Sequence, residues 1–358
     1  MIDNLSDSVL LTVKSFGQHI WLDNLSRPLL QEGLLQRLIT EDGIDGVTSN
    51  PAIFQKAIDG SPCYREDLER LRASKLDAEA RYEALVVPDI QAACDLLWPA
   101  YESSSGASGY VSLEVSPLLA QQMAATEAAA LRLRQAVGRD NLLIKVPATS
   151  AGVRAFEQLT ASGVRVNVTL IFSLAQYEAV AQAYLLGAQR WLDGGGDAKQ
   201  LRAVASVFLS RIDTLVDQHL DAIDGAAALK GQCGVALAKC CYRRYLEIFH
   251  GPDFAALRQA GVRPQTPLWA STGTKNPAYS DVLYVEPLIG AETINTLPDA
   301  TLDAFRDHGC AADTLTTGMD EAQAHMEALA AQGIDLAEVG ETLQADGVRL
   351  FVAAYEKS

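Results

Sequence analysis

Leu142-Leu143-Ile144-Lys145-Val146-Pro147 is an apolar run that carries a single charged side chain. Strands buried on both faces belong to parallel sheets covered by helices, and they read as nearly continuous Val, Ile and Leu runs. The run therefore predicts a buried strand of a parallel sheet with Lys145 inside it.

Burying Lys145 at such a position costs free energy, because removal from water disfavours the charged form of an amine. One interpretation is a structural ion pair with a buried carboxylate. The other is a lysine that is neutral near pH 7, which is a nucleophile able to form a Schiff base with a carbonyl group. The segment alone leaves both open.

Seven further short segments have the length and pattern of strands. With the Lys145 segment, the predicted strands are 20–23, 46–50, 111–115, 142–147, 165–172, 204–209, 267–271 and 282–285. Amphipathic helical patterns fill most of the gaps, such as 174–192, which follows Ser173 as a candidate N-cap. Eight strands alternating with helices predict an α/β protein with a closed (β/α)8 barrel, the TIM-barrel fold. A doubly wound open sheet is the alternative, but no glycine-rich phosphate loop follows the first strand.

The chain is longer than a minimal barrel needs, and the additional segments have helical sequence patterns. A charged helical insertion is expected at about 59–98, and a polar helical extension at about 293–358. The segment from Asp346 to Tyr355 has an apolar face, so we expect this last helix to pack across one end of the barrel near the active site. Residues 1–358 are predicted to form one domain.

Composition restricts the partners. A formal charge of −16 disfavours nucleic acid, which needs a basic stripe, and any phosphate site must be built from a few local cations. No apolar stretch is long enough to span a bilayer, and the N-terminus lacks a secretory pattern. None of the six cysteines forms a C-x-x-C pair. We therefore expect a cytoplasmic protein with reduced thiols and no membrane or nucleic-acid partner.

Polar residues follow the predicted strands at one end. Active sites of (β/α)8 barrels lie at the carboxyl ends of the strands, and here those ends carry Asp23, Thr48, Asn50, Glu114, Lys145, Asn167, Thr169, Ser206, Arg211, Ser271 and Lys275. Any one of them has a structural explanation, such as a loop cap at Asp23, a turn residue at Asn50 or a helix cap at Ser271. One polar residue at a strand end is expected by chance, but polar residues at the ends of seven successive strands are much less expected.

These side chains supply the parts of a Schiff-base reaction. Lys145 would attack a ketone and become an iminium that accepts electrons, while Asp23 and Glu114 would divide the acid and base work. Asn50 and Asn167 offer donors and acceptors suited to a polyol. A phosphate would be held by the fork of Arg211, the point charge of Lys275 and the Ser271 to Thr274 backbone.

Four motifs in this pattern resemble the transaldolase family, in its longer bacterial branch, from about Gln18 to Gly290. They are Asp45-Gly46-Val47-Thr48-Ser49-Asn50-Pro51, Leu143-Ile144-Lys145-Val146-Pro147-Ala148-Thr149, Val166-Asn167-Val168-Thr169-Leu170-Ile171-Phe172-Ser173 and Ser206-Val207-Phe208-Leu209-Ser210-Arg211-Ile212-Asp213. The resemblance implies a cytoplasmic transferase of the non-oxidative pentose phosphate pathway. It would pass a dihydroxyacetone unit from sedoheptulose 7-phosphate to glyceraldehyde 3-phosphate, giving erythrose 4-phosphate and fructose 6-phosphate.

The resemblance also assigns roles to matching positions. Lys145 would be the Schiff-base lysine and Asp23 the proton acceptor, with Glu114 and Thr169 holding a catalytic water. The dihydroxyacetone pocket and phosphate grip would be formed by Thr48, Asn50, Asn167, Ser206, Phe208, Arg211, Ser271 and Lys275. Lys275 departs from the family, since better-known members have an arginine there, and this change puts the phosphate contacts in question.

Two other functions stay open from the sequence. An aldolase on the same scaffold would release free dihydroxyacetone, and a non-catalytic barrel would only bind sugar phosphates. We expect no cofactor and no metal, because the five histidines are scattered and none shares a strand end with a second candidate ligand. A monomer and a homodimer are both compatible with the pattern.

Overall fold

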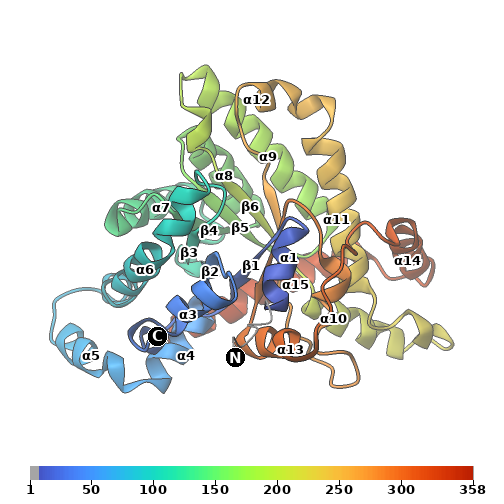
Figure 1. The fold of residues 1–358 in the computed structure, drawn as a ribbon, viewed down its shortest axis with the longest axis horizontal. Helices are drawn as coiled ribbons and strands as arrows, with labels where there is room; N and C mark the ends of the chain where they lie inside the picture. The colour runs from blue at the N-terminus through green and yellow to red at the C-terminus, as the bar shows by residue number, and fades with distance from the viewer. Residues whose placement is uncertain (1–7, 358) are drawn as a thin grey trace, which may run out of the picture.

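Eight parallel strands close into a barrel at the centre of the molecule. The computed structural model describes residues 8–357, and each strand pairs with its neighbours in chain order, β8 closing the ring on β1. The helices surround these strands in Figure 1. The strands are β1 Gln18–Leu22, β2 Gly46–Thr48, β3 Tyr110–Glu114, β4 Leu142–Pro147, β5 Val166–Ile171, β6 Ala203–Phe208, β7 Thr266–Ala270 and β8 Thr293–Leu297. The predicted (β/α)8 barrel is confirmed, and the open sheet is excluded.

Seven of the predicted strands are confirmed, each within two residues at either end, but the eighth prediction is wrong. Residues 282–285 form a turn that leads into the 3-10 helix η6, Glu286–Leu288, and β8 lies at Thr293–Leu297. The run Val282-Leu283-Tyr284-Val285 is apolar because most of it is buried against helices: the Tyr284 hydroxyl donates to Asp213, and its ring lies close to Gly234. The C-terminal segment from 293 therefore begins with a strand of the barrel, not with the predicted helical extension.

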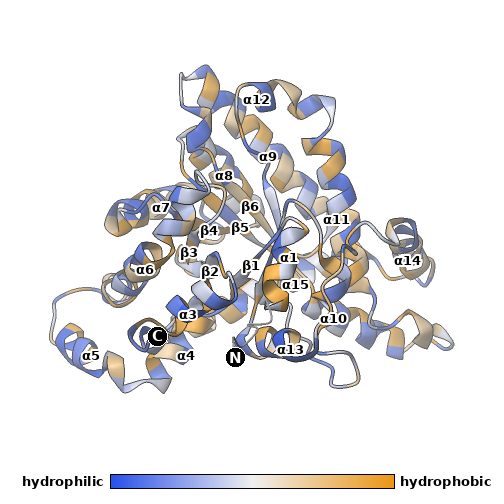
Figure 2. Cartoon of the chain, in the orientation of Figure 1, coloured by the Kyte–Doolittle hydropathy of each residue, from blue (hydrophilic) through white to orange (hydrophobic). Residues whose placement is uncertain are grey.

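The helices alternate hydrophobic and hydrophilic residues around their circumference, as Figure 2 shows. Ser173 caps α9 as predicted, since its side chain accepts a hydrogen bond from the Gln176 N–H. The α-helices are α1 Val9–Ser15, α2 Arg27–Gln31, α3 Leu34–Glu41, α4 Pro51–Gly60, α5 Arg65–Arg72, α6 Ala78–Ser103, α7 Met123–Val137, α8 Ser150–Ala161, α9 Leu174–Asp193, α10 Ser210–Asp221, α11 Cys233–Phe249, α12 Ala255–Gln259, α13 Asp299–His308, α14 Met319–Ala331 and α15 Leu336–Tyr355. Further 3-10 turns are η1 Pro62–Tyr64, η2 Pro117–Leu119, η3 Ala198–Gln200, η4 Ala226–Leu229 and η5 Pro252–Phe254.

The predicted insertion at about 59–98 is helical, but most of it is α6, which contacts β3. A helix that returns the chain to the next parallel strand is part of the βαβ unit itself. The added part is therefore the shorter stretch that holds η1 and α5.

The last helix, α15, crosses the carboxyl end of the barrel as predicted. The Gln344 side chain donates to the carbonyls of Ala148, 2.9 Å away, and Leu170, 3.1 Å away, which follow β4 and end β5. Gly347 brings the helix close to the strand, because a Cβ atom there would lie 2.8 Å from the Leu170 side chain. Leu170 itself has a φ of +60° at a bulge, where β5 gains one residue against β6 between Val168 and Ile171.

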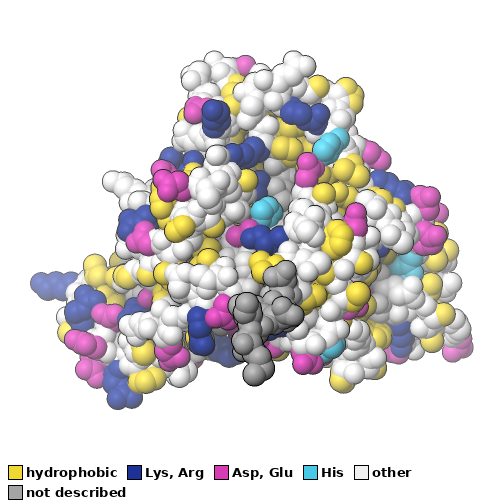
Figure 3. All heavy atoms as spheres, viewed as in Figure 1, with side chains coloured by type: hydrophobic (Ala, Val, Ile, Leu, Met, Phe, Trp, Pro, Cys, Tyr) yellow, Lys and Arg dark blue, Asp and Glu magenta, His cyan; other side chains and the backbone are white. Residues whose placement is uncertain are grey.

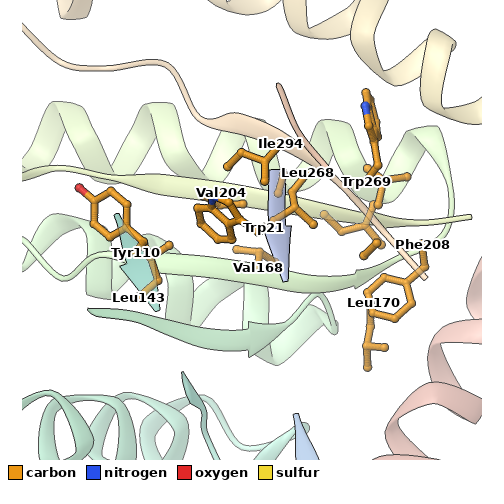
Figure 4. Close-up of a cluster of buried hydrophobic side chains, with 14 of the residues drawn as sticks. Trp21, Tyr110, Leu143, Val168, Leu170, Val204, Phe208, Leu268, Trp269 and Ile294 are labelled. Atoms are coloured by element: carbon orange, nitrogen blue, oxygen red, sulfur yellow. The ribbon is translucent and has the colours of Figure 1, made fainter. Parts of the chain in front are cut away.

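The barrel interior is filled by large apolar side chains. Figure 4 shows Trp21, Val204, Leu268 and Ile294 gathered between the strands that carry them, and all four are buried. Gly46 is required beside them, because a Cβ atom there would lie 2.3 Å from the Trp21 ring. The interior is therefore a packed core, and the candidate site lies in a cavity at the carboxyl ends of the strands.

The face seen in Figure 3 carries acidic and basic side chains interspersed, with no continuous basic stripe on that face. Across residues 8–357, none of the helices has both the length and the apolar composition that crossing a bilayer requires.

Candidate active site

A cavity of about 180 Å³ opens at the carboxyl ends of the strands. Ten of the twelve predicted site residues line it: Asp23, Thr48, Asn50, Lys145, Thr169, Ser206, Phe208, Arg211, Ser271 and Lys275. The other two, Glu114 and Asn167, lie directly behind this lining, where they contact its members. The structure thus brings together all twelve residues, which are spread over 253 positions of the sequence from Asp23 to Lys275.

Lys145 stands in the middle of a row formed by strand register. Its partners are Glu114 on β3 and Asn167 on β5. The Lys145 Nζ donates to the Ser49 carbonyl at 3.0 Å and lies 3.5 Å from the Glu114 Oε2. Both side chains are about 5% exposed or less. Lys145 therefore makes the buried ion pair of the structural interpretation, and it also reaches the cavity as the catalytic one requires.

Asp23 lies at the end of β1, and its carboxylate accepts a hydrogen bond of 2.7 Å from the Thr48 hydroxyl on β2. Burial raises the pKa of Asp23 above its usual range, and the nearby Asp299 carboxylate raises it further. The Thr48 hydrogen bond and the Lys145 ammonium oppose this effect without reversing it. A carboxyl group with a raised pKa is a stronger base than an exposed aspartate.

Glu114 forms the second carboxyl group of the site. Burial raises its pKa, with Lys145 acting in the opposite direction. Its Oε2 and the Thr169 hydroxyl are both buried polar atoms without a hydrogen-bond partner among residues 8–357. Buried polar groups are nearly always hydrogen-bonded to protein or to water. These two atoms fit the predicted pair that would hold a water molecule.

Asn167 is oriented by hydroxyl groups on two other strands. Its Oδ1 accepts from the Ser206 hydroxyl at 2.7 Å, and its Nδ2 donates to the Ser112 hydroxyl at 3.2 Å. Asn50 also has a structural role, since its Oδ1 accepts from the Ile53 N–H and caps α4. That bond leaves the Asn50 amide N–H₂ group for the cavity it lines.

Arg211, at the start of α10, contributes a guanidinium without a strong protein partner. No hydrogen bond or ion pair to it is found within the described chain, although Asp346 lies within electrostatic reach. The guanidinium carbon lies 5.8 Å from the centre of the Phe208 ring. Burial lowers the pKa of Arg211. An arginine held at a cost beside a cavity is suited to an anionic ligand.

The other candidate phosphate contacts follow β7. Ser271 has a φ of +53°, a strained value for a residue with a side chain, and its hydroxyl lies 2.8 Å from that of Ser210. Lys275 lines the same cavity. Ser271 is therefore not the helix cap of the structural interpretation, and the strained turn directs its side chain towards the cavity.

Comparison with known proteins agrees with this geometry. Residues 20–358 match the model of the family described as transaldolase/fructose-6-phosphate aldolase. This chain belongs to that family. A protein named transaldolase from Thiobacillus denitrificans is 54% identical over 346 residues, which is 96% of each chain. Proteins of the same name are 47% identical in Neisseria gonorrhoeae, covering 98% of each chain, and 44% identical in Mycobacterium bovis, covering 97% of this chain and 94% of the relative.

Seven residues that line the cavity are outside the predicted set, and two of them, Thr296 and Phe351, show why. Thr296 belongs to β8, and it was hidden because the eighth strand was placed at 282–285. The run Thr293-Ile294-Asn295-Thr296-Leu297 contains three β-branched residues and is followed by Pro298, which is a usable strand signal. Phe351 reaches the cavity from α15. The helix was predicted to lie there, but its periodicity does not say which residue faces a ligand.

The described residues contain no group of three or more His, Cys, Asp or Glu side chains that could hold a metal ion. All six cysteines fall within residues 8–357, and each is free.

Proposed function

We propose that the protein is a transaldolase that uses Lys145 to carry a dihydroxyacetone unit between sugar phosphates. The donor would be sedoheptulose 7-phosphate and the acceptor glyceraldehyde 3-phosphate. The observation that carries the proposal is the position of the Lys145 amine, which lies 3.5 Å from the Glu114 carboxylate and lines the same cavity as Asp23 and Arg211. The names of the related proteins support the same activity.

The first step joins enzyme and donor. The Lys145 amine attacks the ketose carbonyl, a proton moves to the carbonyl oxygen, and the resulting carbinolamine loses water to give an iminium. Glu114 and Thr169, whose buried oxygens have no hydrogen-bond partner in the described residues, would hold that water and supply the proton. The Ser49 carbonyl keeps the Lys145 side chain aimed along the row of strand partners.

The second step breaks the carbon–carbon bond. Asp23 takes the proton of the hydroxyl on the carbon beyond the bond, the bond's electron pair flows to the iminium, and the aldose leaves. An enamine of dihydroxyacetone then remains on Lys145. The acceptor aldehyde reverses these steps, Asp23 returns its proton, and water releases the product. Arg211, Ser271 and Lys275 would hold the phosphates of both aldoses in turn.

Reduction of the Schiff base tests the proposal directly. The protein would be mixed with fructose 6-phosphate and borohydride, digested, and mapped by mass spectrometry. We expect one modified lysine, Lys145. Lys239 is an internal control, because it is buried to a similar degree but donates to the Thr314 and Thr317 carbonyls away from the cavity. Label on Lys239, or on no lysine, would refute the mechanism.

Release of free dihydroxyacetone is the second candidate function, because the family description includes fructose-6-phosphate aldolase. Partial cover of the site by α15 favours transfer, since Phe351 of this helix forms part of the cavity wall and water attack on the bound enamine requires access. With excess acceptor present, we expect erythrose 4-phosphate as an acceptor to yield sedoheptulose 7-phosphate faster than free dihydroxyacetone appears. Dihydroxyacetone as the main product would assign the chain to the aldolase.

A single domain, a cytoplasmic location and a monomeric or homodimeric state remain part of this proposal.

A further inference from the structure

Behind Asp23 lies a chain of hydroxyl groups that crosses three strands. The Thr48 Oγ1 is 2.7 Å from the Asp23 Oδ1 and 2.6 Å from the Thr296 Oγ1. Thr48 is on β2 and Thr296 on β8, and both strands pair with β1, which Asp23 directly follows. Both threonine side chains are almost completely buried. Both residues also line the cavity, and their hydrogen bonds depend on one another.

The proton count of this chain is limited. Each hydroxyl has one proton to donate. When Asp23 is ionised, its carboxylate only accepts, so the Thr48 proton points to Asp23 and the Thr296 hydroxyl must donate to Thr48. When Asp23 has taken a proton, its acid group can donate to Thr48, and the Thr48 proton then turns to Thr296. The Thr296 proton then turns towards the cavity, which Thr296 lines, and no heavy atom has to move in either protonation state of Asp23.

Thr296 is itself held firmly. Its carbonyl accepts a 2.7 Å hydrogen bond from the Thr272 hydroxyl, which is buried in the loop after β7. Its register partner on β1 is Trp21, which packs in the barrel interior. The loop that carries Ser271 and Lys275 is therefore tied to the residue that supports Thr48.

We infer that Thr296 is a positioning residue for the carbon–carbon bond cleavage step, acting on Asp23 through the Thr48 hydroxyl. The inference rests on the proposed function, in which Asp23 takes and returns a proton. A hydroxyl that can reverse its donor direction would keep the carboxyl group in one orientation through that cycle. Loss of the hydroxyl would leave Thr48 with one partner where it needs two.

Thr296→Val tests this, because valine keeps the shape and removes the hydroxyl. One buried hydrogen bond corresponds to about a five- to twentyfold fall in kcat, and KM for fructose 6-phosphate should change less than twofold. Thr296→Ser should recover most of the lost rate. Thr293→Val is the matched control on the same strand, since Thr293 bonds to Gly290 and Gln18 away from the cavity. It should lower the melting temperature and keep kcat.

Trapping the adducts on Lys145 shows whether the slowed step is the carbon–carbon bond cleavage. With borohydride added soon after fructose 6-phosphate, Thr296→Val should give a larger share of the six-carbon adduct on Lys145 and a smaller share of the three-carbon adduct than wild type. A merely structural role would not shift that ratio. Should the valine variant not fold, Thr296→Ala carries the same assay.

Wild-type kcat in Thr296→Val, an equal loss in Thr296→Ser, or an unchanged adduct ratio would overturn the inference. Failure of the proposed function looks different, because wild type itself would then form no adduct on Lys145.

Discussion

Arg211→Ala gives the sharpest test of how the cavity selects phosphorylated substrates. The Arg211 guanidinium has no hydrogen-bonded or ion-paired protein partner in the described chain, so its donors are free for a ligand. Two hydrogen bonds to a charged phosphate are worth about 3 kcal/mol at the low end, which is roughly a hundredfold in kcat/KM. Because the phosphate is remote from the reacting bond, most of the loss should appear as a higher KM.

The same geometry predicts little loss of stability. Removing Arg211 forfeits its contact with the Phe208 ring, worth about 0.5–1 kcal/mol. It also removes a charge whose burial is unfavourable, as the lowered pKa of Arg211 indicates. The two effects oppose each other, so the melting temperature should move by only a few degrees.

The assay compares kcat/KM for fructose 6-phosphate with kcat/KM for fructose, in wild type, Arg211→Ala and Arg211→Lys. We expect the alanine variant to lose the hundredfold on the phosphorylated donor alone. On the phosphorylated donor, the kcat/KM of Arg211→Lys should lie between those of wild type and Arg211→Ala, because lysine keeps the charge and lacks the planar fork. Equal losses on both donors would refute the phosphate role of Arg211.

Three further outcomes are expected. Asp299→Asn removes a negative charge that raises the pKa of Asp23, so this pKa should fall. The acid limb of the kcat/KM profile should therefore move to lower pH. An unmoved limb would contradict the role of Asp23 as base. Gly46→Ala should destabilise the fold by about 1–3 kcal/mol in denaturant titrations, because its Cβ would meet the Trp21 ring, whereas Gly60→Ala has open space and should not. Phe351→Ala should raise the yield of free dihydroxyacetone relative to transfer, measured with acceptor present, and an unchanged ratio would remove α15 from water exclusion.

The sequence was sufficient to predict the fold because seven strands are short apolar runs between clear helical patterns. It failed at the eighth for a physical reason. Burial makes a segment apolar whether it is a strand or a turn packed against helices, and Val282-Leu283-Tyr284-Val285 is such a turn. The true β8 is mostly polar, with Thr293, Asn295 and Thr296 in five residues, and it can be buried because each of the three has a hydrogen-bonding partner.

The site was predicted from residue types at strand ends, which works for side chains that point along a strand into the cavity. Contacts between side chains of non-adjacent strands cannot be predicted in this way. The Asn167 to Ser112 hydrogen bond, between β5 and β3, and the Lys145 to Ser49 hydrogen bond depend on register and bulges that no local pattern encodes. The sequence likewise placed α15 near the site, but Phe351 was identified only from the packed helix.

Closure of the barrel is what makes the surroundings of Asp23 possible. In an open sheet with the same strand order, β1 would have one neighbour, and β8 would lie at the opposite edge. The ring instead gives β1 two neighbours, so hydroxyls 248 positions apart in the chain meet behind one carboxyl group. Asp299, just beyond β8, raises the pKa of that carboxyl group from the same side. The strength of the proposed base therefore depends on the last strand of the barrel, and changes in β8 should alter proton transfer even where every residue that touches substrate is intact.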